Sequence, residues 1–229
     1  QITRNFTLHL SGTPFKAIAK GSFSEEQIYN WSYEDEQEKK ENWTGEKNNP
    51  YEKLPRLNMF TYQMSKMITD EVKKGAQLDD DKNVDYAFDL NEFFATKEDG
   101  KFIHEQDVKR WLDTLTHNEK YPFSTPELRN ELKHTFWILN RVASAKALKA
   151  LLDHHPVFEN YETILAAGDG KSEADDFVAN ENSFNRVCEA IKTNDKTITL
   201  SVGQLTTGVT IPEWTAVMML SNMKSPAFY

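Results

Sequence analysis

The chain has 229 residues, a formal net charge of −9 and 38% hydrophobic residues, which is enough for one large domain or two small ones with a buried core. No apolar run approaches the roughly 18–20 residues of a membrane helix, and no secretory signal pattern is visible, so we expect a cytoplasmic protein without a membrane partner. The single cysteine, Cys188, excludes an internal disulfide framework and a multi-cysteine zinc site. The net charge on its face argues against a nucleic-acid partner. The acids concentrate in residues 25–43 and 79–100, however, which leaves room for a locally basic groove.

The first 23 residues have the pattern of a segment that ends a folded unit. FTLHL (6–10) alternates apolar and polar residues and predicts a strand. The Gly-Thr-Pro within SGTPF (11–15) then breaks the chain sharply.

Residues 24–130 are charged and rich in aromatic residues. RLNMFTY (56–62) predicts a strand, followed by a helix around 64–74. Within HEQDVKRWLDTL (104–115), one stripe follows helical spacing and consists of Val108, Trp111, Leu112 and Leu115. This stripe predicts a helix that packs against a core, and the alternative interpretation is a docking surface for another part of a larger protein.

Residues 131–229 alternate between strand and helix patterns. Strands are predicted at HTFWILNRV (134–142), ETILAAG (162–168), TITLSVG (197–203) and TAVMML (215–220). Helices are predicted at 144–155 and 183–194, with Ser144 and Ser183 as N-caps. Because these strands are apolar at consecutive positions, we expect an α/β fold whose parallel sheet has helices on both faces.

Ligands of open parallel sheets bind at the carboxyl ends of the strands, so the loops after Leu139, Ala167 and Val202 are the expected site. The third of these loops contains QLTTGVTIP (204–212). A glycine lets the backbone approach a phosphate, and hydroxyl groups bind phosphate oxygens. The alternative is an ordinary connection whose threonines serve turn formation.

Three segments resemble motifs of superfamily-two helicases and translocases, and they are most similar to the motors of ATP-dependent restriction enzymes of type I or type III. LTTGVTIP (205–212) resembles motif V, SGTPF (11–15) resembles motif III, and FWILNRVASAKALKALL (136–152) resembles motif IV. The resemblance implies that residues 1–23 end a first RecA-like domain and that residues 24–130 are a linker and a largely helical insertion. Residues 131–229 would then be a partial second RecA-like domain.

The resemblance also implies roles for individual residues. The ATP cleft and its coupling to DNA would involve Thr13, Gly208 and Thr210, the last of which stands where family members often carry an acidic residue. The DNA backbone would be contacted by Asn140, Arg141, Ser144, Thr206 and Thr207. The implied partners are double-stranded DNA, other domains of the same subunit, and the modification and specificity subunits.

Such a motor also needs a phosphate loop, an acidic box for magnesium, and the arginine of motif VI. This sequence lacks all three, so we expect a fragment that does not turn over ATP alone and that meets ATP and Mg²⁺ only in the intact enzyme. The alternative function is a non-catalytic interaction module that docks partner subunits through the acidic, aromatic region 24–130.

Other patterns point weakly to different chemistry. GDGKS (168–172) ends like a phosphate loop, but the spacing to the first glycine fails. The Glu-x-Lys triplets at 38–40, 71–73 and 131–133 match half of a nuclease metal site, although they lie on polar or helix-like stretches. His154 and His155 follow a predicted helix, where the helix dipole accounts for them better than a metal ion.

Overall fold

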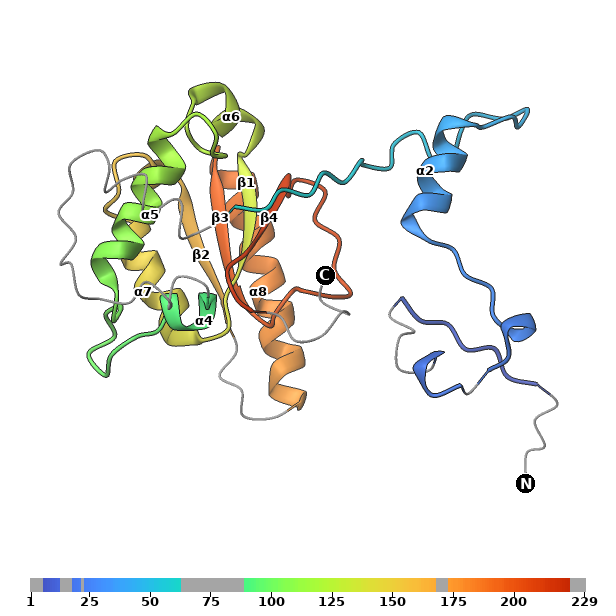
Figure 1. The fold of residues 1–229 in the computed structure, drawn as a ribbon, viewed down its shortest axis with the longest axis horizontal. Helices are drawn as coiled ribbons and strands as arrows, with labels where there is room; N and C mark the ends of the chain where they lie inside the picture. The colour runs from blue at the N-terminus through green and yellow to red at the C-terminus, as the bar shows by residue number, and fades with distance from the viewer. Residues whose placement is uncertain (1–5, 13–17, 22, 63–88, 168–172, 223–229) are drawn as a thin grey trace. The chain divides into compact units, whose positions relative to one another are not determined.

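The computed structural model of the protein describes residues 6–12, 18–21, 23–62, 89–167 and 173–222, with the backbone alone for 173–180. The described residues fall into two compact units that divide between Thr61 and Tyr62 (Figure 1). Several features of the sequence lie outside the described residues: Thr13, the helix predicted around 64–74, the Glu-x-Lys triplet at 71–73, and the GDGKS loop.

The second unit is built on a four-stranded sheet with the order β2-β3-β1-β4. Its strands are β1 (His134–Ile138), β2 (Glu162–Ala167), β3 (Thr197–Val202) and β4 (Ala216–Met219). All three strand pairs are parallel. The predicted α/β fold with a parallel sheet is therefore confirmed, together with all four strands of this region.

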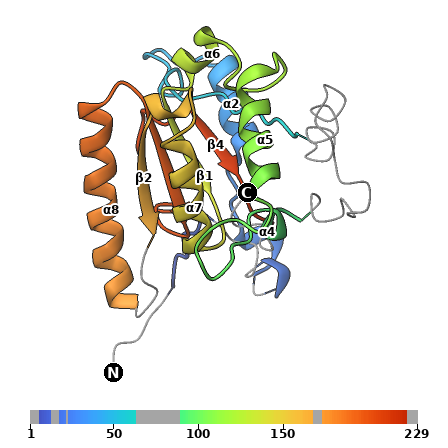
Figure 2. The ribbon, with the colours of Figure 1, turned by 90° about the vertical axis from the view of Figure 1, so that its left-hand side faces the viewer.

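Helices cover both faces of this sheet, as expected. The connection from β1 to β2 is α7 (Val142–Leu152), which is followed by the short η3 (Phe158–Asn160), and the connection from β2 to β3 is α8 (Glu173–Thr193). Figure 2 shows α8 on one side of the strands and α5 (Glu105–His117) on the other. The unit thus has three layers.

Alternating side chains of β1 supply both cores. Trp137 and Leu139 belong to the cluster formed with α5 and α7, whereas Phe136 and Ile138 belong to the cluster formed with α8. Successive side chains of a strand point to opposite faces, so a strand that is apolar at every position fits only a sheet covered on both sides. Val187 of α8 is fully buried in the second cluster.

The residues that precede the sheet in the sequence pack into the core on the face of α5 and α7. They form α4 (Leu90–Phe93), α5 and α6 (Pro126–Glu131). The predicted stripe of α5 is buried, with Val108 0%, Trp111 2%, Leu112 1% and Leu115 1% exposed. The Trp111 ring packs edge-on against Phe94 and Trp137, with centroid distances of 5.2 and 6.1 Å. The stripe is therefore core, and the docking interpretation of it is wrong.

The first unit contains η1 (Glu25–Gln27) and α2 (Tyr33–Glu41). The strands predicted at 6–10 and 56–62 are wrong, because the structure has neither of them. Phe6, Leu8 and Leu10 are 92%, 82% and 86% exposed. A strand needs the hydrogen bonds of a neighbouring strand, and no other strand exists among the described residues of this unit.

Both predicted N-caps are also wrong. Arg141 occupies the N-cap of α7, and Ser144 lies inside that helix. Ser183 lies in the middle of α8, which begins at Glu173. The polar run EADDFVANEN (173–182) hides the true start of α8 because apolar periodicity becomes clear only after it. Among the described helices, none is long and apolar enough to cross a membrane.

Candidate functional site

The carboxyl ends of β1 and β3 flank a topological switch point. The chain leaves β1 toward β2 at one edge of the sheet and leaves β3 toward β4 at the other edge. The two ends are neighbours, since the Leu139 N–H donates to the Ser201 carbonyl at 2.9 Å. Open α/β sheets bind ligands at such a point. This geometry brings together two of the loops selected from the sequence.

The loop after β1 presents two exposed residues, Asn140 and Arg141. Within the described part of the chain, the Arg141 guanidinium has no ion pair with a carboxylate, so its charge is available to a ligand. Ser144 is different, because it is fully buried and its hydroxyl donates to the Phe94 carbonyl at 2.6 Å. Ser144 therefore holds the segment 89–102 against α7 and presents no hydroxyl to DNA.

The loop after β3 has an unusual backbone. Gly203, Leu205 and Gly208 all have positive φ, at 78°, 59° and 73°, and for a residue such as Leu205 this conformation is uncommon. The Thr206 hydroxyl donates to the Gly203 carbonyl at 3.1 Å, and the Ser201 hydroxyl donates to the Gln204 carbonyl. These bonds fix the loop at the end of β3.

The outer part of this loop is open to solvent. Thr207, Gly208 and Thr210 are exposed. A Cβ built on Gly208 would meet no heavy atom within 4 Å, so the backbone there is accessible to a ligand. Thr206 is partly buried, and its hydroxyl is already engaged within the loop.

A polar network missed by the sequence analysis joins this loop to α8. The Ser183 hydroxyl donates to Gln204 Oε1 at 2.7 Å. Arg186 Nη2 donates to the Ser183 hydroxyl at 3.2 Å and to the Leu165 carbonyl at 2.9 Å. The two hydrogen bonds that leave α8, from Ser183 to Gln204 and from Arg186 to Leu165, each join residues 21 positions apart in the sequence. No local sequence pattern marks these residues.

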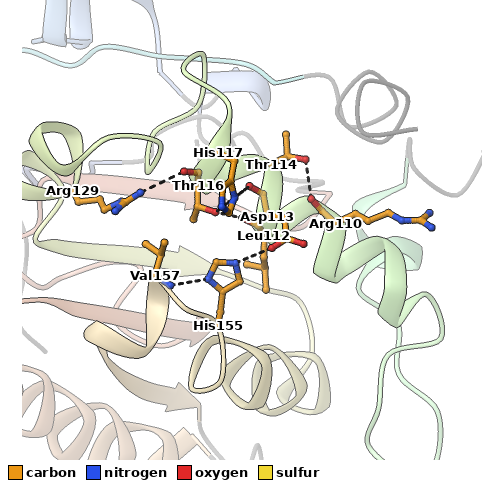
Figure 3. Close-up of polar contacts among 9 residues, drawn as sticks. All are labelled: Arg110, Leu112, Asp113, Thr114, Thr116, His117, Arg129, His155 and Val157. Carbon is orange, nitrogen blue, oxygen red and sulfur yellow. Dashed lines mark hydrogen bonds and ion pairs between the residues drawn. The ribbon is translucent and has the colours of Figure 1, made fainter. Parts of the chain in front are cut away.

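A second polar cluster lies where α5 meets the end of α7, and Figure 3 shows its members. His155 Nε2 is 3.3 Å from Asp113 Oδ1, and His155 Nδ1 accepts the Val157 N–H at 3.2 Å. Because Nδ1 accepts a hydrogen bond, the neutral ring carries its proton on Nε2, and this N–H donates a hydrogen bond to Asp113. Burial lowers the pKa of His155, opposed by the attraction of Asp113.

Both ring nitrogens of His155 are thus engaged, and neither is available as a general base or a metal ligand. The Arg129 guanidinium is also engaged in hydrogen bonds within the protein, because it donates to the carbonyls of Thr116, Phe123 and Ser124. His154 Nδ1 is 2.8 Å from the Ala150 carbonyl at the end of α7. This cluster stabilises the packing of α5 on α7.

The described residues contain no group of three or more His, Cys, Asp or Glu side chains that could hold a metal ion. Glu38 lies on the helix α2, and Glu131 ends α6, whereas a nuclease site needs its Glu-x-Lys on a strand beside a second carboxylate. Lys133 Nζ pairs with Asp195 Oδ1 at 2.5 Å. That lysine forms a surface ion pair.

Comparison with known proteins finds a relative whose name states a function. The chain is 30% identical to the C-terminus of a type II restriction enzyme and methyltransferase, so named, of Mycoplasma pneumoniae. The alignment spans 250 positions and covers 96% of this chain and 33% of the relative, so the chain spans about a third of that protein. No family model matches the chain, and no solved structure matches it significantly.

The name of the relative includes a restriction enzyme, which is the class of protein that the sequence motifs resemble. It specifies type II with a methyltransferase, whereas the motifs resemble type I and type III motors. The name contains no mention of a helicase, a translocase or ATP.

Proposed function

We propose that this chain is part of the DNA-translocating motor of a restriction enzyme and that its residues 131–229 correspond to part of the second RecA-like domain. The observation that carries the proposal is that exposed residues lie in both loops at the switch point of a parallel sheet, Arg141 after β1 and Thr207 and Gly208 after the neighbouring β3. The similarity to a restriction enzyme over 96% of the chain supports the same class of protein. ATP-dependent translocation rests on the three motif resemblances.

The DNA backbone would lie along the carboxyl edge between the loops after β1 and β3. Arg141 would supply a positive charge, and Asn140 would supply a neutral donor. Thr207 and the open backbone at Gly208 would approach phosphate oxygens without adding charge. Thr206 would act through its backbone N–H, because its hydroxyl already bonds within the loop. Such contacts orient DNA without reading its sequence.

The same loop would form one wall of an ATP cleft in the intact enzyme. Gly208 and the exposed Thr210 fit this role, since the space around Gly208 is open. The described residues contain no group of three or more His, Cys, Asp or Glu side chains that could hold Mg²⁺. We propose that Mg²⁺ enters with ATP in the intact enzyme.

Double-stranded DNA is the proposed ligand, and other domains of the same polypeptide or its modification and specificity subunits are the proposed partners. The methyltransferase in the name of the relative is consistent with a modification partner on the same chain.

A substitution that introduces a negative charge tests whether DNA binds at the carboxyl ends of the strands. We expect Thr207→Asp to weaken the binding of labelled duplex DNA to the 229-residue chain at least tenfold at low salt, because a carboxylate would repel phosphates. The matched control is Thr215→Asp. It adds the same charge directly before β4, at the end of the sheet where the parallel strands begin. Equal affinity of the two variants, or no DNA binding by the unmodified chain, would refute the proposal.

A second candidate function is an interaction module, favoured by the exposed aromatic residues of the first unit. Tyr29 is 85% exposed and Trp31 is 41% exposed, and α2, which follows them, buries no residue and has three acids in its first turn. A partner with a basic, apolar surface would fit. Pull-down of the modification subunit that is lost on Tyr29→Ser, while DNA binding is absent, would favour this function.

A further inference from the structure

Arg186 lies near the carboxyl end of the sheet with a fixed orientation. Its Nη2 donates to the Leu165 carbonyl, two residues before the end of β2, and to the Ser183 hydroxyl on its own helix. Both acceptors are neutral. The residue itself is exposed, so the guanidinium is held in place by one nitrogen while its remaining donors can reach a ligand.

Among the side chains that the structure describes, no carboxylate pairs with Arg186. Glu189 stands one turn along α8, yet no described acid lies within ion-pair distance of Arg186. Elsewhere in the same unit Lys109, Lys133 and Lys149 each pair with an acid. An arginine fixed by hydrogen bonds and left without a counter-charge is the arrangement expected of an anion-binding group.

The group bonded to Arg186 also contains a donor without an acceptor. Gln204 is 5% exposed, and its Oε1 accepts the Ser183 hydroxyl. Its Nε2 is buried and has no hydrogen-bond partner. Buried polar groups of this kind call for an explanation such as a bound ion or water. The network of Arg186, Ser183 and Gln204 thus has donors in excess, and an oxyanion supplies both negative charge and acceptor atoms.

We propose that Arg186 is a phosphate-binding residue at the carboxyl edge of the sheet, and that Ser183 and Gln204 position it against the loop after β3. This inference rests on the proposed function and adds a second cation to that surface, on the face covered by α8. Arg141, by contrast, precedes α7 on the opposite face. The phosphate belongs either to the DNA backbone or to a bound nucleotide.

The test measures duplex DNA affinity for the 229-residue chain at several salt concentrations. Each phosphate contact contributes about 0.9 to the slope of log K against log salt for duplex DNA. We expect Arg186→Gln to reduce this slope by about that amount and to weaken binding at low salt, and Arg186→Lys to retain most of the slope. The matched control is Lys192→Gln, which removes the same charge from the last turn of the same helix.

A parallel titration of the intact enzyme with ATP, in which the cleft is complete, distinguishes the two sources of phosphate. Loss of ATP binding in Arg186→Gln with an unchanged DNA slope would assign the site to the nucleotide, and a reduced DNA slope would assign it to DNA. The thermal unfolding of each variant separates a local effect from misfolding. Unchanged slope and unchanged ATP affinity in a folded Arg186→Gln would overturn the inference while the proposed function stands. Absence of DNA binding by the unmodified chain would overturn both.

Discussion

His155 donates from Nε2 to Asp113 across the contact between α7 and α5, and burial holds the pKa of His155 below its usual value of 6.5. The unfolded chain therefore binds a proton more readily than the folded chain once the pH falls below about 6.5. We expect the free energy of unfolding to be fully retained above that pH and to decrease as the pH falls further. Chemical denaturation at pH 7.5 and pH 5.5 measures the difference.

The matched variant for this prediction is His155→Gln, which removes one titrating group. Its stability should depend less on pH than that of the unmodified chain. Some dependence should remain, because burial also lowers the pKa of His134. An equal loss of stability in both proteins would show that His155 does not titrate differently on folding.

Thr199 and Thr197 provide a paired test of buried hydroxyls on β3. Both are fully buried, but Thr199 Oγ1 has no hydrogen-bond partner, whereas Thr197 Oγ1 lies 3.0 Å from His134 Nδ1. A buried, unsatisfied polar group costs about 1–3 kcal/mol. We expect Thr199→Val to raise the free energy of unfolding by about 1 kcal/mol and Thr197→Val to lower it by a similar amount. Thermal or denaturant unfolding would contradict this if Thr199→Val were the less stable variant.

Ser144 was expected to contact DNA, yet its hydroxyl bonds to the buried Phe94 carbonyl. We therefore expect Ser144→Ala to lower the free energy of unfolding by about 1–2 kcal/mol, because the Phe94 carbonyl would lose its hydrogen bond. DNA affinity at a temperature well below the unfolding transition should not change. A variant that keeps its stability but loses DNA binding would restore the original expectation.

Trp111 tests whether the stripe of α5 is core. Removal of a buried tryptophan leaves a cavity and typically costs about 3–5 kcal/mol. We expect Trp111→Ala to reach that range, whereas Trp31→Ala in the exposed part of the first unit should cost less than about 1 kcal/mol. Similar, small losses for both variants in denaturant titrations would contradict the burial of Trp111.

Local periodicity was sufficient to predict the four strands and the core stripe of α5 in the second unit, but not the first unit. Strands such as β1 and β3 are apolar on both faces or bounded by clear turns, so their type and order follow from the sequence. The pattern of FTLHL is equally regular, but Phe6 and Leu8 remain exposed because strand formation depends on a partner that local sequence does not reveal.

The site was predictable to a similar extent. Arg141 and Thr207 follow strand ends, and the rule for ligands at the carboxyl edge selects them without coordinates. Arg186 could not be selected in this way, because its importance depends on contacts with Leu165 and Ser183 that arise only when α8 packs on the sheet. The burial of Ser144 depends in the same way on the distant segment around Phe94.

Arg141 provides the most direct test of whether the carboxyl edge of the sheet binds the DNA backbone. Lys133 precedes β1 and Arg141 follows it, so Lys133→Ala and Arg141→Ala remove one positive charge from opposite ends of the same strand. Fluorescence anisotropy with duplex DNA at increasing salt should show that Arg141→Ala alone weakens binding and reduces the salt slope by about one phosphate contact. Equal affinities and slopes for the two variants would contradict the account.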